Sequence, residues 1–205
     1  MISDTKVVAI GGGTGLSTML KGLKLHTHNI TAVVTVADDG GSSGILRSDL
    51  GMLAPGDVRN CVSALAEVDP VMGELLNFRF KDGSLKGHSL GNLFLAALNE
   101  TSSSFDEAVK KFSHLAGVVG TVYPVTNESV TLSALLEDGR LIEGESHIGV
   151  HHDGPKNGIV KLMVNPEKPK AVDGVIKALE KADIIVLGPG SLYTSIIPNL
   201  LVDGV

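Results

Sequence analysis

Two glycine-rich turns could bind phosphate, and each follows a short apolar run. Residues 11–15 follow the apolar residues 7–10, and residues 188–191 follow residues 182–187. Glycine lets the backbone approach an anion closely, and free N–H groups at the start of a helix point toward it. We therefore expect both turns to contact the phosphates of a nucleotide. The expected contacts are Gly12, Gly13, Thr14, Gly15, Gly190, Ser191 and Tyr193.

The spacing of the first turn differs from that of two well-known phosphate loops. Leu16 stands where the dinucleotide fingerprint G-x-G-x-x-G has its third glycine, and no Gly-Lys-Ser/Thr follows, as a Walker loop requires. A nicotinamide oxidoreductase is therefore disfavoured. A tight strand-to-helix turn without a ligand is the alternative. The place of the turn, at the end of the first strand, favours nucleotide binding.

Two adjacent carboxylates follow the second apolar run, residues 30–36. Asp38 and Asp39 would lie at the carboxyl end of a parallel strand, near the first glycine turn, with Ser42 in the same segment. One carboxylate there often holds a ribose hydroxyl, whereas two could hold Mg²⁺, which prefers oxygen ligands. The alternative is a turn in which Asp and Gly only satisfy backbone groups.

The next segment, residues 46–60, is expected to be a loop and is unusually polar for a connection. Arg47 and Arg59 could bind phosphate with two nitrogens each or pair with the nearby aspartates. Asp57 is expected to be the N-cap of the helix that follows, and Asn60 to contact the ligand. These alternatives cannot be separated by spacing.

The histidines give weaker evidence for a functional site. His88 and Asn92 precede a strongly apolar helix and are expected to direct donors into a cleft, although no nucleophile partnered by a base is apparent. A metal site at His147, His151, His152 and Asp153 is disfavoured because the spacing fits no known template.

Composition limits the classes of function. The chain has 205 residues, 43% of them hydrophobic, which suffices for one large domain. Aromatic residues make up 3% and the net charge is −6, so nucleic-acid binding is not expected. The lone Cys61, expected to be inert core, excludes an internal disulfide and suits the cytoplasm. No apolar run approaches the roughly 20 residues of a membrane span.

Periodicity predicts an α/β, Rossmann-like three-layer fold with a mainly parallel sheet and helices on both faces. Apolar runs at residues 7–10, 30–36 and 182–187 alternate with amphipathic helical patterns. Asp138-Gly139 between residues 132–137 and 140–143 predicts a small antiparallel β-hairpin insert.

Five motifs together resemble the family that joins bacterial gluconeogenesis factors (YvcK-like proteins) to 2-phospholactate transferases of the CofD type. They occur in the family's order along nearly the whole chain, and as a set they are specific. They are Ala9-Ile-Gly-Gly-Gly-Thr-Gly15, Ala37-Asp-Asp-Gly-Gly-Ser-Ser-Gly44, Ala54-Pro-Gly-Asp-Val-Arg-Asn60, Gly87-His-Ser-Leu-Gly-Asn92 and Leu187-Gly-Pro-Gly-Ser-Leu-Tyr-Thr-Ser195.

The resemblance is closer to the gluconeogenesis-factor branch, which implies a regulator that binds a nucleotide sugar, with UDP-N-acetylglucosamine the expected ligand. It further implies support of cell shape and wall synthesis during gluconeogenic growth, with a protein partner in wall synthesis, and it leaves a homo-oligomer open. No covalent cofactor is expected.

The transferase branch moves a phospholactyl group from a guanosine diphosphate donor to a deazaflavin and uses Mg²⁺. Its metal-binding aspartates correspond to Asp38, Asp39 and Asp49 here. Gly51 stands where the transferases have a further aspartate, which disfavours transferase chemistry. The family's chains are longer, so residues 1–205 are expected to form a single CofD-like nucleotide-binding domain that lacks its C-terminal part.

Overall fold

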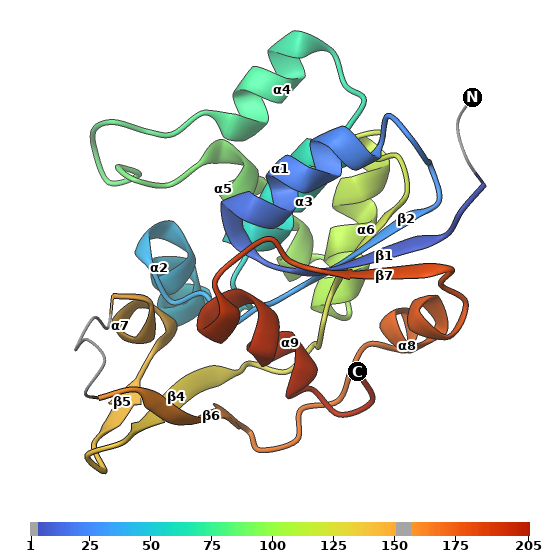
Figure 1. Cartoon of the computed structure of the whole chain (residues 1–205). Coiled ribbons are helices and arrows are strands. Elements are labelled where there is room, and N and C mark those ends of the chain that lie inside the picture. The colour runs from blue at the N-terminus through green and yellow to red at the C-terminus, as the bar shows by residue number, and fades with distance from the viewer. Residues whose placement is uncertain (1–3, 151–156) are drawn as a thin grey trace.

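A parallel sheet of four strands forms the centre of the fold (Figure 1). The computed structural model describes residues 4–150 and 157–205. The strands lie in the order β3-β2-β1-β7, and every neighbouring pair is parallel. Their bounds are β1 Val7–Gly11, β2 Ile30–Val34, β3 Thr121–Pro124 and β7 Ile184–Leu187. Continuous apolar runs suit such strands because both of their faces are covered.

Helices cover both faces of this sheet, as periodicity predicted. On one face Leu16, Leu65 and Phe112 are buried in a large apolar cluster, and on the other Val8 and Val175 belong to a smaller one. The first face carries α1 Gly13–Leu23, α3 Gly56–Leu65 and α6 Phe105–Leu115, and the second carries α8 Asp173–Glu180. The predicted three-layer α/β fold is confirmed.

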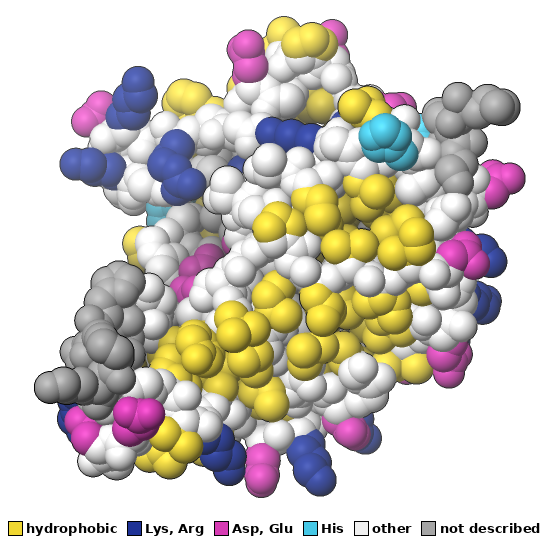
Figure 2. Space-filling view, viewed as in Figure 1, with side chains coloured by type: hydrophobic (Ala, Val, Ile, Leu, Met, Phe, Trp, Pro, Cys, Tyr) yellow, Lys and Arg dark blue, Asp and Glu magenta, His cyan; other side chains and the backbone are white. Residues whose placement is uncertain are grey.

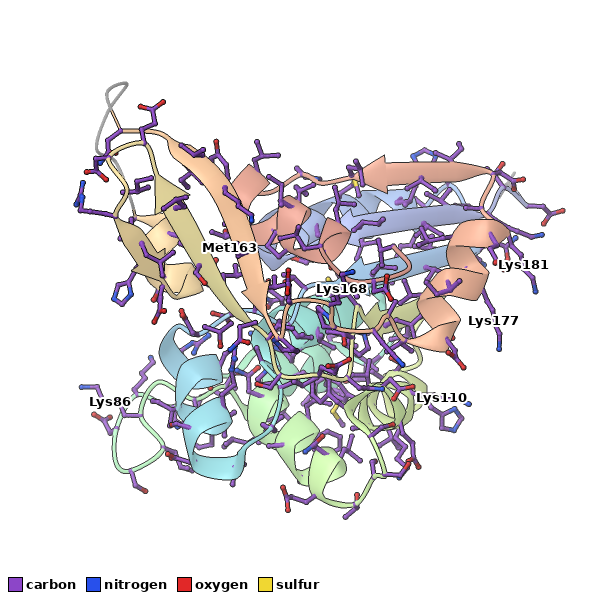
Figure 3. All side chains as sticks on the ribbon, turned by 90° about the horizontal axis from the view of Figure 1, so that it is seen from below. Lys86, Lys110, Met163, Lys168, Lys177 and Lys181 are labelled. Atoms are coloured by element: carbon purple, nitrogen blue, oxygen red, sulfur yellow. The ribbon has the colours of Figure 1, made fainter. Side chains whose placement is uncertain are left out.

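The predicted hairpin is part of a second, antiparallel sheet of three strands in the order β5-β4-β6. These strands are β4 Thr131–Leu136, β5 Leu141–Glu143 and β6 Ile159–Asn165. Gly139 forms the turn at a φ of 85°, which suits glycine. In Figure 3 this sheet, with Met163 on β6, lies at the opposite end of the molecule from Lys177 and Lys181.

Several boundaries differ from the predictions. The first helix begins at Gly13 rather than at residue 16, and the second strand ends at Val34. Helix α2, Gly41–Leu50, occupies a stretch predicted as turn and loop, because Leu46 packs into the core and Gly51 ends the helix in a left-handed conformation. The remaining helices are α4 Pro70–Asn77, α5 Leu90–Glu100, α7 Glu145–Gly149, η2 Leu192–Ile196 and α9 Ile197–Leu200.

Edge strand β7 is poorly covered. Ile184, Ile185 and Leu187 are each about half exposed, and Figure 2 shows a broad apolar band across this face of the molecule.

Among the helices of the described residues, none has the length and apolar character that crossing a membrane would require.

Candidate functional site

A polar crevice lies where β1 and β2 end. It is lined by the first turns of α2 and α3 and by Asp38, Asp57, Arg59, Arg79 and Asn92. Figure 2 shows a hollow in this face, with acidic side chains inside it and basic side chains along its upper rim. Ligands of open parallel sheets bind at the carboxyl ends of the strands, so this crevice is in the expected place.

The first glycine turn contacts one wall of the crevice. A Cβ at Gly12 would lie 2.5 Å from Thr35 Cγ2 and 2.7 Å from Asp57 Oδ2, so only glycine fits without a shift. Gly13 has a φ of 66°, and its backbone N–H donates to the Asp57 carboxylate. One N–H group predicted to bind phosphate is therefore already used by a side chain.

The second glycine turn packs directly against the first. A Cβ at Gly15 would lie 2.5 Å from the carbonyl oxygen of Pro189, and one at Gly190 would lie 3.6 Å from the carbonyl oxygen of Gly12. Asn199, which is fully buried, ties the turns together, because its Nδ2 donates to the carbonyls of Gly11 and Ser195 at 3.1 and 2.7 Å. The sequence analysis did not identify Asn199.

The other expected ligand contacts near these turns are more exposed. Thr14 is exposed, and its carbonyl accepts from Ser17 Oγ and Thr18 Oγ1. Ser191 caps η2, since its Oγ accepts from the backbone N–H of Thr194 at 3.3 Å. Tyr193 is 37% exposed.

Asp57 has a different role from the predicted one. The N-cap of α3 is Pro55, and Asp57 lies in the first turn with its carboxylate on the glycine turn. Burial, and secondly the Asp38 carboxylate, raise the pKa of Asp57 from 3.8 to about 7, although the Gly13 hydrogen bond opposes this. A carboxyl that titrates near neutral pH thus faces the crevice, which marks it as a candidate functional group.

The three aspartates expected to hold metal do not converge. Asp38 lines the crevice, and its Oδ1 accepts from the backbone N–H of Gly40 at 2.9 Å. Asp39 instead caps α7, accepting from the N–H groups of Glu145 and Ser146 at 2.8 and 2.9 Å. Asp49 is exposed near the far end of α2 and accepts from Ser48 Oγ. Within residues 4–150 and 157–205, no group of three or more acidic, histidine or cysteine side chains is placed to hold a metal ion.

A buried polar network forms the opposite wall of the crevice. Ser42 Oγ lies 3.0 Å from His88 Nδ1 and accepts from Asn92 Nδ2 at 3.1 Å. Arg59 Nε donates to Asn92 Oδ1 at 3.3 Å, and Arg59 Nη1 donates to Asn77 Oδ1 at 2.9 Å. Ser42 and Asn92 line the crevice, whereas His88, which was also expected to direct a donor into a cleft, is buried behind Ser42. The contact of a hydroxyl with an imidazole was not apparent from the sequence.

The remaining sequence-predicted residues lie in different surroundings. Arg47 donates to the carbonyls of Asp38 and Val130, so it neither binds an aspartate carboxylate nor faces the crevice. Asn60 lines the crevice, and Cys61 is buried core, where burial raises the pKa of its thiol. His147 Nδ1 contacts the carbonyl of Glu143 at 2.8 Å. His151, His152 and Asp153 lie outside the described residues.

Comparison with known proteins extends these observations. Residues 7–205 match the sequence profile of a family described as 2-phospho-L-lactate transferase CofD. A relative from Thermoanaerobacterium thermosulfurigenes is 58% identical over 204 residues, which are 100% of this chain and 63% of that protein. A Bacillus subtilis protein named gluconeogenesis factor is 48% identical, over 96% of this chain and 61% of its own length.

The fold has a close match among solved structures. A crystal structure of a Bacillus halodurans protein superposes with a TM-score of 0.92 at 46% sequence identity. The match covers 98% of this chain and 64% of that one. The chain therefore spans less than two thirds of the length of these three proteins.

Proposed function

The chain belongs to the CofD family, and from that premise we propose that it binds a nucleotide sugar of the UDP-N-acetylglucosamine type in the crevice. The observation that carries the proposal is a crevice at the carboxyl ends of parallel strands that is lined by Asp38, by the first turn of α2 and by Asp57, whose carboxylate lies against Gly12. Backbone N–H groups at such helix starts bind phosphate, and a carboxylate there binds ribose hydroxyls.

The two walls of the crevice suggest how the ligand lies. Asp38 would accept from a ribose or sugar hydroxyl, while the nucleoside extends over the glycine turns toward Thr14 and Tyr193, which are exposed. Diphosphate oxygens would accept from the N–H groups at the start of α2.

Mg²⁺ fits the crevice in a different way from that predicted. Asp38 and Asp57 both face it, and Mg²⁺ is typically held by one or two carboxylates together with substrate phosphates. When bound there, the ion would offset the negative charge that phosphates and carboxylates bring together. Asp39 and Asp49 are engaged elsewhere and would not take part.

The pairing of Asp38 with Asp57 also supports a second function, a Mg²⁺-dependent transfer from a nucleoside diphosphate-linked donor, since the family description names a 2-phospho-L-lactate transferase. In that reaction a metal held by Asp38 and Asp57 would offset the charge on the nucleoside monophosphate that leaves when the phospholactyl group passes to an acceptor hydroxyl. We place it second because Gly51 lacks the carboxylate that the resemblance to transferases requires.

Calorimetric titration separates these functions. We expect the chain to bind UDP-N-acetylglucosamine more tightly than GDP or NAD and to leave it chemically intact. Binding of GDP in preference, and only with Mg²⁺ present, would favour the transferase. If none of the three ligands binds with or without Mg²⁺, the nucleotide proposal is wrong.

The relatives named gluconeogenesis factor suggest a cellular role. We propose that ligand binding supports cell shape and wall synthesis during gluconeogenic growth. Cells that carry only a variant unable to bind the ligand should lose their normal shape on a gluconeogenic carbon source. Normal shape in those cells would separate the binding site from the cellular role.

A further inference from the structure

One buried cation in the crevice has only neutral hydrogen-bond partners. Arg59 is 7% exposed, and its guanidinium donates to the amide oxygens of Asn77 and Asn92. No ion pair between described residues includes Arg59. The aliphatic part of its side chain is also held in place, because it packs closely against Gly91. A Cβ at position 91 would lie only 2.9 Å from Arg59 Cδ. A buried charge is costly unless an opposite charge compensates it. The Asp57 carboxyl interacts with Arg59 through space but forms no ion pair with it, and its own pKa is raised, so an anion in the crevice would compensate the guanidinium further.

A second guanidinium lines the same crevice. Arg79 follows α4, is exposed, and donates from Nη1 to the carbonyl of Gly87. Burial, and secondly the charge of Arg79, lower the pKa of Arg59. The two cations are therefore close enough to repel each other.

The first turn of α2 faces the arginines. This helix has ten residues, and its N-cap, Gly40, supplies no side-chain hydrogen bond to the first turn. Gly41, Ser42 and Ser43 all line the crevice. The N–H groups at the start of a helix have no partner within the helix and carry partial positive charge.

We propose that Arg59, Arg79 and the first turn of α2 form the subsite for the phosphate groups of the ligand. The inference deepens the proposed function and takes the nucleotide part of the ligand from it. Guanidinium groups bind phosphate with two parallel hydrogen bonds, and here the orienting amides of Asn77 and Asn92 hold one of them in place.

This subsite indicates where in the crevice the phosphates and the hydroxyl groups of the ligand would lie. The Asp57 carboxylate lies against the first glycine turn, whereas the Asp38 carboxylate lies between the starts of α2 and α3. Both arginines line the same crevice. A diphosphate would therefore bind at the arginines, not in the glycine turns, where Asp57 already takes the Gly13 N–H and Pro189 fills the space beside Gly15. Hydroxyl groups of the ligand would face the carboxylates.

The test compares Arg79→Gln with Arg140→Gln, which removes another exposed arginine, one that pairs with Asp138 on the β4–β5 hairpin. Inorganic pyrophosphate and UDP-N-acetylglucosamine are titrated into each protein. Arg79→Gln should weaken both ligands about tenfold, the effect of losing a hydrogen bond to a charged group. It should also leave the free protein as stable as wild type or more so, because the repulsion on Arg59 is relieved. Arg140→Gln should change neither affinity.

Unchanged affinity of Arg79→Gln for both ligands would overturn the inference, even if UDP-N-acetylglucosamine binds tightly and the proposed function stands. If wild type binds pyrophosphate through Arg79 but no nucleotide, the proposed function fails and the subsite stands.

A second variant tests the other arginine. Arg59→Lys keeps the charge but loses the two-nitrogen fork of the guanidinium, so it should also weaken pyrophosphate binding. Full affinity in that variant, when folded, would likewise contradict the inference.

Discussion

Replacing Asp57 by Asn should stabilise the protein strongly above pH 7 and have little effect near pH 4. The carboxyl is held among protein groups beside Asp38, and its pKa in the folded state is about 7 instead of 3.8. The folded protein therefore binds a proton that the unfolded chain has lost, and wild-type stability falls as the pH rises from about 4 to about 7. Asparagine carries no charge and can still accept from the Gly13 N–H.

The size of this stabilisation follows from the shift in the pKa of Asp57. Each pKa unit corresponds to about 1.4 kcal/mol, so the gain from Asp57→Asn is at most about 4 kcal/mol above pH 7. Urea unfolding at pH 4.5, 6 and 8 measures it, with Asp82→Asn as a control for the loss of one exposed carboxylate. A difference in unfolding free energy that does not grow with pH would show that Asp57 is not held protonated by the fold.

Replacing Gly15 by Ala should destabilise the protein by about 2 kcal/mol and weaken ligand binding. The new Cβ would lie 2.5 Å from the Pro189 carbonyl oxygen, which belongs to the backbone, so the two glycine turns must separate. Thermal unfolding and titration with UDP-N-acetylglucosamine measure the two effects.

Gly22 provides the matched control in the same helix. A Cβ there meets nothing within 4 Å, so Gly22→Ala should stabilise α1 by about 0.5–1 kcal/mol and leave binding unchanged. If both variants have the same stability, close packing of the two turns is not what requires glycine at position 15.

The sequence allowed correct prediction of the features that depend on a local pattern of residue types. Buried runs such as Val7–Gly11 and the Asp138-Gly139 turn gave the parallel sheet and the hairpin, because periodicity and turn chemistry act over a few residues. Both glycine turns were found for the same reason. The helix over Gly41–Leu50 was missed because its weak propensity is compensated by burial of Leu46, which only the folded chain reveals.

The chemistry of the crevice could be predicted only in part, since it depends on distant partners. Asp39 caps a helix 106 residues away along the chain, so its adjacency to Asp38 did not indicate a shared metal site. Asp57 matched a local N-cap pattern, but its carboxylate contacts the first glycine turn instead. For Arg59, phosphate binding was only one of two alternatives, the other being an ion pair with an aspartate. The sequence could not decide between them, because the neutral hydrogen-bond partners of Arg59, Asn77 and Asn92, come from two other helices.

The central claim is that one crevice binds the diphosphate of a nucleotide sugar, and mapping backbone amide NMR shifts tests it most directly. Adding UDP-N-acetylglucosamine to the 205-residue chain should shift the amides of Gly12, Gly13 and Gly41 through Ser43 most. The apolar groove lined by Leu75, Phe94 and Leu115 should show no change. Shifts confined to that groove, or none anywhere at millimolar ligand, would contradict the account.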